Sequence, residues 1–204
     1  MQLKTVGISI ILFFGVFIAK AQVITYTNLS KKYVYKIKAE RVIDSNAIFA
    51  KTKLNLFIYQ HNRLIQTITF KNGVLFNECF TSDTASRSYI TGKNRNKEIP
   101  DYDFGDIIIA DLNFDGKEDI AIKYDSGGNG GPIYNFYIQQ PNGIFKRDYY
   151  LTNNVGSFPE YINIKHKTIT TQIHANVHQE AQKTFKYNLT NKKWRLIKWK
   201  MVEA

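Results

Sequence analysis

The sequence predicts an all-β fold, a single domain of short antiparallel strands arranged as a propeller-like assembly, a sandwich or a barrel. Aromatic residues are abundant, with 14 Phe, 13 Tyr and 2 Trp among 204 residues, and they occur in β-branched runs typical of packed sheets. Turn signals such as Asn142-Gly143 separate these runs at short intervals. No run after the N-terminal segment has the pattern of a convincing helix.

The elements follow in order along the chain. Gln60-His61-Asn62 is expected to close a hairpin, and Lys71-Asn72-Gly73 and Thr190-Asn191-Lys192 are expected to be turns. A long polar loop is expected over residues 81–106. The expected strands are residues 32–43, 53–59, 63–70, 74–80, 88–91, 107–110, 120–124, 133–139, 144–151, 161–164, 168–177, 183–189 and 193–200.

The first 21 residues have the composition of a secretory signal peptide. Lys4 gives a positive start, residues 6–18 form an apolar core of about 13 residues, and Ala19-Lys20-Ala21 places small residues at the cleavage positions. This core is shorter than the roughly 20 residues that span a bilayer. No cysteine stands directly after it, where a lipid would be attached. We therefore expect an exported protein, periplasmic or extracellular and not a lipoprotein, with one domain over residues 22–204.

Cysteine content and charge narrow the function. Cys79 is the one cysteine, so no intrachain disulfide can form, and we expect it to be a small buried residue. The formal net charge is +11, yet eight acidic residues stand against one basic residue between Glu98 and Asp119. Such an acidic patch on a basic protein favours a cation site. Nucleic acid is not the expected partner, because the chain has no recognition motif.

The segment from 111 to 119 reads D-L-N-F-D-G-K-E-D, with oxygen-bearing side chains at every second position and a glycine at the sixth. Calcium takes six to eight oxygen ligands, and a chain that curls at Gly116 lets these oxygens face one ion. The twelfth position is Ile122, where an EF-hand has a bidentate Glu, so this is an EF-hand-like loop in a β-hairpin. A tight turn without metal is the alternative. The candidate Ca²⁺ ligands are the side chains of Asp111, Asn113, Asp115 and Asp119 and the carbonyl of Lys117.

The same segment, with its flanks from Ala110 to Ile122, resembles the calcium loop of FG-GAP and VCBS repeats, which build β-propeller blades. A wider similarity covers residues 54–199 and ends in a hairpin with Trp194 and Trp199. It also includes Arg63-Leu64-Ile65-Gln66-Thr67-Ile68, a glycine-rich stretch before Tyr134-Asn135-Phe136-Tyr137, and Asn142-Gly143-Ile144-Phe145. This order is similar to that of small periplasmic β-propeller-like proteins with one calcium loop. Some of these are immunity proteins that inhibit peptidoglycan-cleaving lysozyme effectors of bacterial secretion systems. The resemblance implies a protein-binding module and not an enzyme.

Two further groups leave alternatives open. His174 and His178 alternate with apolar residues and are expected on one strand face. That face is either solvated or, with a third ligand, suited to zinc. The stretch from Ser126 to Pro132 holds four glycines and is either a flexible crossover or a loop that reaches a partner. Nearby tyrosines, Tyr134 and Tyr137 among them, would then serve as interface anchors or pack along the sheet.

The sequence favours an exported calcium-binding module whose partner is another protein, such as an envelope hydrolase or a lysozyme-type effector. No G-x-S-x-G, H-E-x-x-H or P-loop pattern occurs, and no pair of carboxylates can be assigned to glycosidase work, so we assign no catalytic residues. The rival functions are a calcium-dependent cell-wall or glycan-acting enzyme, which needs a deep cleft with two carboxylates, and a glycan-binding or adhesion module, which needs a shallow aromatic groove.

Overall fold

The computed structural model describes residues 18–43, 46–128 and 130–203. The expected signal peptide therefore lies outside the described residues, except for its last four positions. Those four open strand β1 (Ile18–Tyr26), where Ala21 pairs with Glu40. The sequence pattern did not predict this strand. Beyond the expected cleavage point, residues 22–26 still pair with the next strand along their whole length.

The first group of strands is an antiparallel meander of β1, β2 (Val34–Ile43), β3 (Phe49–Gln60) and β4 (Arg63–Phe76). His61 and Asn62 both have positive φ, 47° and 63°. A two-residue hairpin turn requires this backbone conformation, so the expected turn between β3 and β4 is confirmed.

The expected turn at Lys71-Asn72-Gly73 is wrong. β4 continues through it, and the register with β3 shifts between Thr52 and Leu54. Asn72 has φ 64°, which inserts an extra residue as a β-bulge instead of reversing the chain. The two strands expected at 63–70 and 74–80 are therefore one bent strand that ends at Phe76, and residues 77–80 form a turn instead of a strand.

The middle group contains β5 (Ser86–Ser88), β6 (Ile107–Ala110), β7 (Asp119–Asp125), β8 (Ile133–Gln139) and β9 (Phe145–Arg147). β7 joins β4 through one parallel pair, Val74 with Asp125, which makes a nine-stranded sheet of the first two groups. β5 also pairs with β6 in parallel. The expectation of purely antiparallel pairing is therefore corrected at these two places.

The third group is a separate antiparallel sheet of β10 (Tyr161–Asn163), β11 (Thr168–Asn176), β12 (Gln179–Asn188) and β13 (Lys193–Glu203). Two short helices, η1 (Pro100–Tyr102) and the π-helix η2 (Leu151–Val155), correct the expectation of a fold without helix. The Asp148 carboxylate accepts the Leu151 N–H at 2.9 Å and so begins η2.

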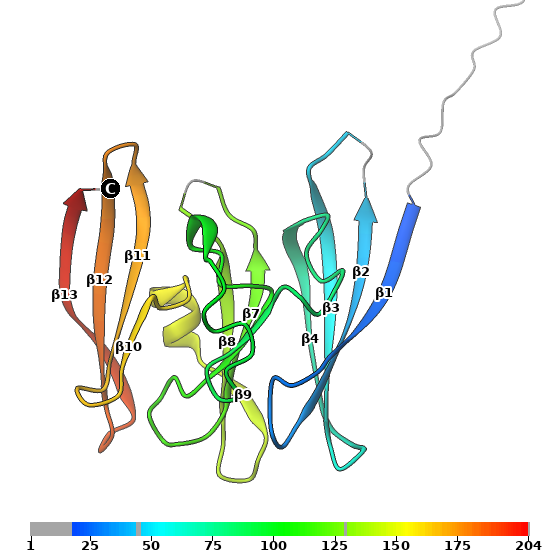
Figure 1. The fold of residues 1–204 in the computed structure, drawn as a ribbon, viewed down its shortest axis with the longest axis horizontal. Helices are drawn as coiled ribbons and strands as arrows, with labels where there is room; N and C mark the ends of the chain where they lie inside the picture. The colour runs from blue at the N-terminus through cyan, green and yellow to red at the C-terminus, as the bar shows by residue number, and fades with distance from the viewer. Residues whose placement is uncertain (1–17, 44–45, 129, 204) are drawn as a thin grey trace, which may run out of the picture.

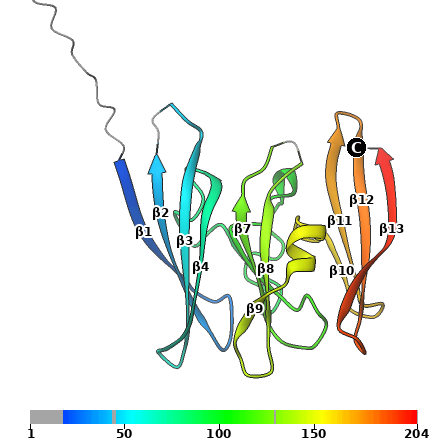
Figure 2. The same ribbon diagram turned by 180° about the vertical axis from the view of Figure 1, so that it is seen from behind.

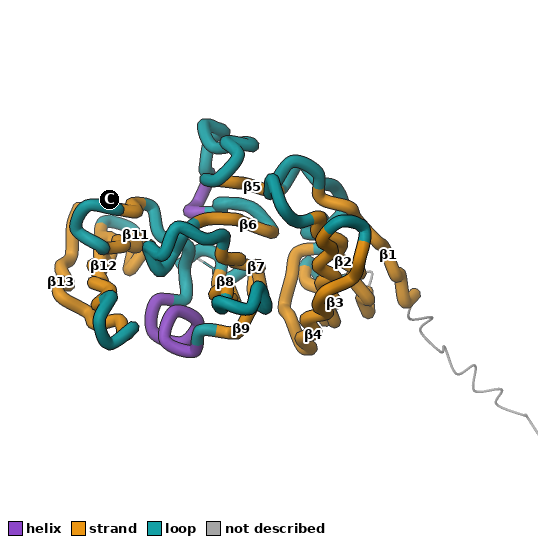
Figure 3. Tube along the Cα trace, turned by 90° about the horizontal axis from the view of Figure 1, so that it is seen from below, coloured by secondary structure: helices purple, strands orange, loops and turns teal. Residues whose placement is uncertain are grey.

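The all-β prediction is confirmed, but its closed forms are not. The described residues form two open sheets, with no closed barrel and no complete propeller. The three strand groups stand side by side, and their strands run roughly along one direction (Figures 1 and 2). Seen from below, the groups follow one another across the molecule from β1 to β13 (Figure 3). No helix in the described part of the chain is long and apolar enough to cross a membrane.

The middle group is buried on both faces. Ile107 and Ile109 of β6 pack with the first group, whereas Ile108 and Ala110 pack towards the third sheet. Successive side chains of a strand point to opposite faces, so a strand between two cores must be apolar throughout. This explains the unbroken Ile107–Ala110 run, and it places the loops at both ends of β7 on a rigid layer.

Candidate functional site

The predicted calcium loop connects β6 to β7 and is held by its own side chains. The Asp111 carboxylate accepts the N–H groups of Asp115 at 3.1 Å and Gly116 at 2.9 Å. The Asn113 side-chain oxygen accepts the same Asp115 N–H at 3.1 Å, and the Asp115 carboxylate accepts the Lys117 N–H at 2.9 Å. Gly116 has φ 81°, a conformation that favours glycine. The side chains at 111, 113 and 115 therefore converge on one bend of the backbone.

Asp119 has a different role from its neighbours. Its side chain is buried, and Oδ2 accepts the N–H groups of Leu112 at 2.9 Å and Asn113 at 3.3 Å. Oδ1 accepts the N–H of Gln139, in β8, at 2.9 Å. Burial raises the pKa of this carboxyl to about 8, although these three hydrogen bonds act to lower it. Asp119 thus ties the start of the loop to its end and to the neighbouring strand.

The donor set fits a hard cation in its chemistry. Carboxylate, amide and backbone oxygens are what calcium prefers, and burial raises the pKa of Asp111 as well as that of Asp119, so a bound cation would offset the cost of two desolvated carboxylates. Among the described residues, however, no three His, Cys, Asp or Glu side chains gather as metal ligands. Calcium binding by Asp111, Asn113, Asp115, Lys117 and Asp119 therefore stays a prediction.

The glycine-rich loop begins where β7 ends. Ser126, the first residue of this loop, is bonded to β4. The Ser126 N–H donates to the Val74 carbonyl at 2.8 Å, and the Ser126 hydroxyl accepts the Phe76 N–H at 2.8 Å. The Asp125 carboxylate accepts the Gly127 N–H at 2.7 Å. The loop is thus anchored at its first residues, and it is not a free crossover there.

The calcium loop and the glycine-rich loop lie at opposite ends of β7. The calcium loop precedes Asp119, the first residue of the strand, and the glycine-rich loop follows Asp125, its last residue; Figure 1 shows the two loops at the lower and upper ends of the middle group. Seven residues of strand span about 20 Å. The loops therefore cannot form one continuous patch.

An open groove of about 680 Å³ lies beside the glycine-rich loop. It collects residues that are far apart in the sequence, from the β2–β3 side, η1, the glycine-rich loop and the β11–β12 turn. One wall carries Phe49 and Phe76, whose rings stack at 4.8 Å between centroids. Val177, in the β11–β12 turn, also lines the groove and is 87% exposed. The other lining residues used below are Asp101, Asp103, Gly127, Gly128, Gly131 and His174.

The groove is acidic although the protein is basic. Asp101 and Asp103 line it, and no lysine or arginine does so in the described part of the chain. The Asp103 carboxylate accepts a hydrogen bond from Lys123 at 2.7 Å and another from the Gly105 N–H at 3.0 Å. Asp101 is exposed, and it makes no such contact with a cation among the described residues.

The acidic segment does not form the single patch that the sequence suggested. Asp106 and Asp119 are buried, and Glu118 accepts a hydrogen bond from Ser30 at 2.8 Å. The rest divides between the ends of the middle group, with Asp101 and Asp103 at the groove and Asp111 and Asp115 in the calcium loop. The buried strand β6 separates the two sets.

A buried ion-pair cluster is joined to the groove through Asp103. Lys123 Nζ is 2.7 Å from Asp103 and 3.0 Å from Asp106. Burial alone would lower the pKa of Lys123, but the Asp106 and Asp103 carboxylates outweigh it and raise this pKa well above its usual range. Cys79 lies beside the cluster and is buried as expected, and burial raises its thiol pKa to about 11.

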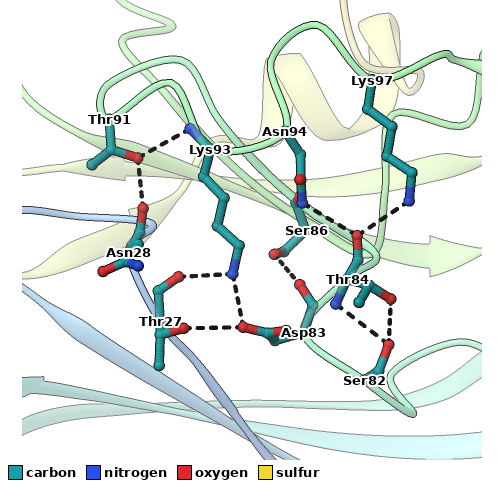
Figure 4. A network of polar contacts seen from close by, with 10 residues as sticks. All are labelled: Thr27, Asn28, Ser82, Asp83, Thr84, Ser86, Thr91, Lys93, Asn94 and Lys97. Atoms are coloured by element: carbon teal, nitrogen blue, oxygen red, sulfur yellow. Dashed lines mark hydrogen bonds and ion pairs between the residues drawn. The ribbon is translucent and has the colours of Figure 1, made fainter.

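The polar loop from 81 to 97 is bonded to the β1–β2 turn (Figure 4). Lys93 Nζ donates to the Asp83 carboxylate and to the Thr27 carbonyl, both at 2.8 Å. Thr91 donates to the Asn28 carbonyl at 2.6 Å. The chain that leads into η1 and Asp101 is therefore held in place at Thr91 and Lys93.

The histidine pair does not occupy one strand face. β11 ends at Asn176, and His178 lies in the turn before β12. His174 instead has Nδ1 3.5 Å from the Glu180 carboxylate, which also accepts a hydrogen bond from the Tyr102 hydroxyl. The zinc alternative thus loses its second histidine, and His174 links the third sheet to η1 at the groove.

Sequence and structure comparisons extend the resemblance only at the level of fold. No protein-family profile matches the chain, and no curated protein sequence matches it either. A solved structure described as "Structure of a Xanthomonas Type IV Secretion System related protein" is similar over 89% of this chain and 88% of its own, with a TM-score of 0.54 and 14% identity. This similarity shows a shared fold and assigns no family.

Proposed function

We propose that this protein is a secretion-system-associated binding module that inhibits a peptidoglycan-cleaving, lysozyme-type enzyme through the groove at the glycine-rich loop. The structural neighbour is described as related to a type IV secretion system, and the proposal carries that association over to this chain. It also rests on the resemblance of the 110–122 segment and its surroundings to calcium-loop immunity proteins. Export belongs to the proposal, because peptidoglycan lies outside the cytoplasm.

The observation that carries the proposal is the chemistry of the groove. A partner surface needs apolar anchors at its centre and complementary charge around it. Phe49, Phe76 and Val177 supply the apolar area, and Asp101 supplies a free negative charge. Lysozyme-type enzymes are often basic, so an acidic groove on a protein of formal charge +11 is the surface best suited to one.

The calcium loop has a supporting role in this proposal. It lies at the other end of β7, so the partner would contact the glycine-rich loop and not the ion. Bound calcium would neutralise Asp111 and Asp115 and hold the start of β7 against β8 through Asp119. The ion would thereby stabilise the layer that carries the groove.

An enzyme of cell-wall chemistry is the rival proposal. Asp101 and Asp103 are the carboxylates that line the groove, but Asp103 is bonded to Lys123 and to the Gly105 N–H. A general acid must instead hold its proton near the substrate. Hydrolysis of peptidoglycan by the purified protein alone would favour the enzyme.

The test is a titration of this protein into a turbidity-clearing assay with a panel of lysozyme-type enzymes. We expect one or more of them to be inhibited at an equimolar ratio, and Asp101→Lys to weaken that inhibition. Glu98→Lys, an exposed residue outside the groove lining, is the matched charge control. No inhibition across the panel, or equal inhibition by both variants, would overturn the assignment of the groove.

A further inference from the structure

The third sheet ends in a tip formed by two neighbouring turns. One turn, residues 164–167, joins β10 to β11, and the other, residues 189–192, joins β12 to β13. The Tyr187 N–H donates to the Lys167 carbonyl at 2.9 Å, so the first turn is bonded to the end of β12 that leads into the second turn. Both lie at the lower end of the third sheet in Figures 1 and 2. We call these two turns, together with Lys193, the sheet tip.

Each turn of the sheet tip exposes one aliphatic side chain. Ile164 is 65% exposed and Leu189 is 51% exposed. Neither side chain is used to hold its turn, because the turns are closed by asparagines: the His166 N–H donates to Asn163 at 3.0 Å and the Thr190 N–H donates to Asn188 at 2.9 Å. Both aliphatic groups are therefore accessible at the surface, and Leu189 lines a groove together with Lys192.

Cations surround these aliphatic groups. Between residues 161 and 204 there are nine Lys or Arg and two acidic residues, and of those two Glu180 is buried at the groove end. Glu203 is the last residue of β13 and lies at the strand end away from the tip. The cations at the tip are Lys165, Lys167, Lys192 and Lys193, and Lys186 and Arg195 follow one step up the strands.

The nearest carboxylates do not reverse this charge. Asp115 and Asp148 share a groove with Lys192, but Lys117, Lys146 and Arg147 line the same groove. Asp115 lies 3.7 Å from Lys117, and Asp148 caps η2. The groove beside the tip therefore holds more cations than carboxylates among its described lining residues.

We propose that the sheet tip docks this protein on a bilayer surface that contains anionic phospholipid. Exposed aliphatic side chains ringed by lysines match the two layers of such a surface, an apolar boundary below and phosphate groups above. A protein partner would instead favour exposed aromatic anchors, and the groove beside the tip offers one aromatic side chain among the described residues, Tyr187, which is buried. The inference is independent of the inhibitor proposal. Because the tip and the acidic groove lie at opposite ends, docking would leave the groove open.

The test is sedimentation of the protein with vesicles of phosphatidylcholine and phosphatidylglycerol at about two to one. Each lysine near such a surface contributes about a five-fold change in affinity, so Lys165→Gln with Lys192→Gln should weaken binding about 30-fold. Ile164→Ser with Leu189→Ser should weaken binding without changing the charge. The matched control is Lys51→Gln with Lys71→Gln, two exposed residues of β3 and β4, which should bind like the unaltered protein.

Several results would overturn the proposal. They are no binding to the anionic vesicles, equal binding to vesicles of phosphatidylcholine alone, and tip variants that bind like the control. Retention on immobilised heparin without vesicle binding would assign the tip to a soluble polyanion and would also reject the membrane. Unchanged melting temperatures of all variants would confirm that they fold, since the substituted side chains are exposed. Lysozyme inhibition measured in the same samples reports on the groove separately.

Discussion

Gly127 and Gly131 face each other so closely that the Gly131 carbonyl oxygen occupies the place where a Cβ atom on residue 127 would lie. Both residues have positive φ, 66° and 77°, so the loop closes on itself at its base. Only glycine at 127 combines this backbone conformation with this contact. The closed form of the loop that lines the groove therefore requires glycine at position 127.

Gly127→Ala should destabilise the protein by at least about 1–3 kcal/mol and displace the loop, since both the contact and the φ angle are violated. Gly128→Ala is the matched control, because a Cβ atom there meets nothing within 4 Å, and it should change stability by less than about 0.5 kcal/mol. Urea denaturation of both variants measures the difference. Equal stabilities would show that the loop is not closed as described.

Lys123→Met should be strongly destabilising, by about 3–5 kcal/mol, because it leaves the buried Asp106 carboxylate without its cation. Lys53→Met removes a lysine whose partner, Glu40, is partly exposed, and it should change stability much less than Lys123→Met does, because solvent screens exposed ion pairs. The double variant Lys123→Met with Asp106→Asn should recover part of the loss. If Lys123→Met lowers the free energy of unfolding as little as Lys53→Met does in chemical denaturation, the buried Lys123–Asp106 pair does not stabilise the fold.

Stability should fall between about pH 9 and pH 11 because of Cys79. Burial raises its thiol pKa from a usual value of 9.0 to about 11, so in this window the unfolded chain has lost the proton that the folded chain keeps. The folded state then loses up to about 2–3 kcal/mol as pH rises. Cys79→Ala should remove this share of the alkaline loss while leaving that of the buried tyrosines. A native thiol that reacts freely with a thiol reagent at pH 8 would contradict the burial.

Calcium should raise the melting temperature, and chelation should lower it. The missing twelfth-position Glu predicts a weak dissociation constant of about 10⁻⁴–10⁻³ M, and at 100-fold excess a ligand of the folded state adds about 2.7 kcal/mol. Asp115→Ala should abolish the response, whereas Glu98→Ala, an exposed carboxylate outside the loop, should keep it. Identical melting of the unaltered protein in calcium and in chelator would reject the structural role.

The strands of the middle group could be predicted from the sequence because burial on both faces leaves an unambiguous pattern. Residues 107–110 and 133–139 were expected as strands with the bounds that the structure gives them. The pattern at Asn72 predicts a turn where the structure has a bulge, since a residue with positive φ occurs in both. Strand β1 was missed because its first residues coincide with the expected signal peptide.

The two candidate sites differ in how far a sequence can reveal them. The calcium loop is local, so the spacing of Asp111, Asn113 and Asp115 already indicates their convergence. The groove is not local, because Phe49, Asp101 and Val177 meet only through the packing of three strand groups. For the same reason the acidic segment looked like one patch in the sequence, although the buried strand β6 divides it.

The inhibitor proposal is tested most directly by isothermal titration of this protein into a lysozyme-type enzyme that it inhibits, at about 0.1 M and about 1 M salt. We expect a one-to-one complex that weakens at high salt, as the Debye length falls from about 10 Å to about 3 Å. We expect it to weaken further with Asp101→Lys but not with Glu98→Lys. A complex whose affinity changes neither with salt nor with Asp101→Lys would contradict the inhibitor proposal. So would heat released when this protein alone is added to peptidoglycan, because that heat would come from turnover.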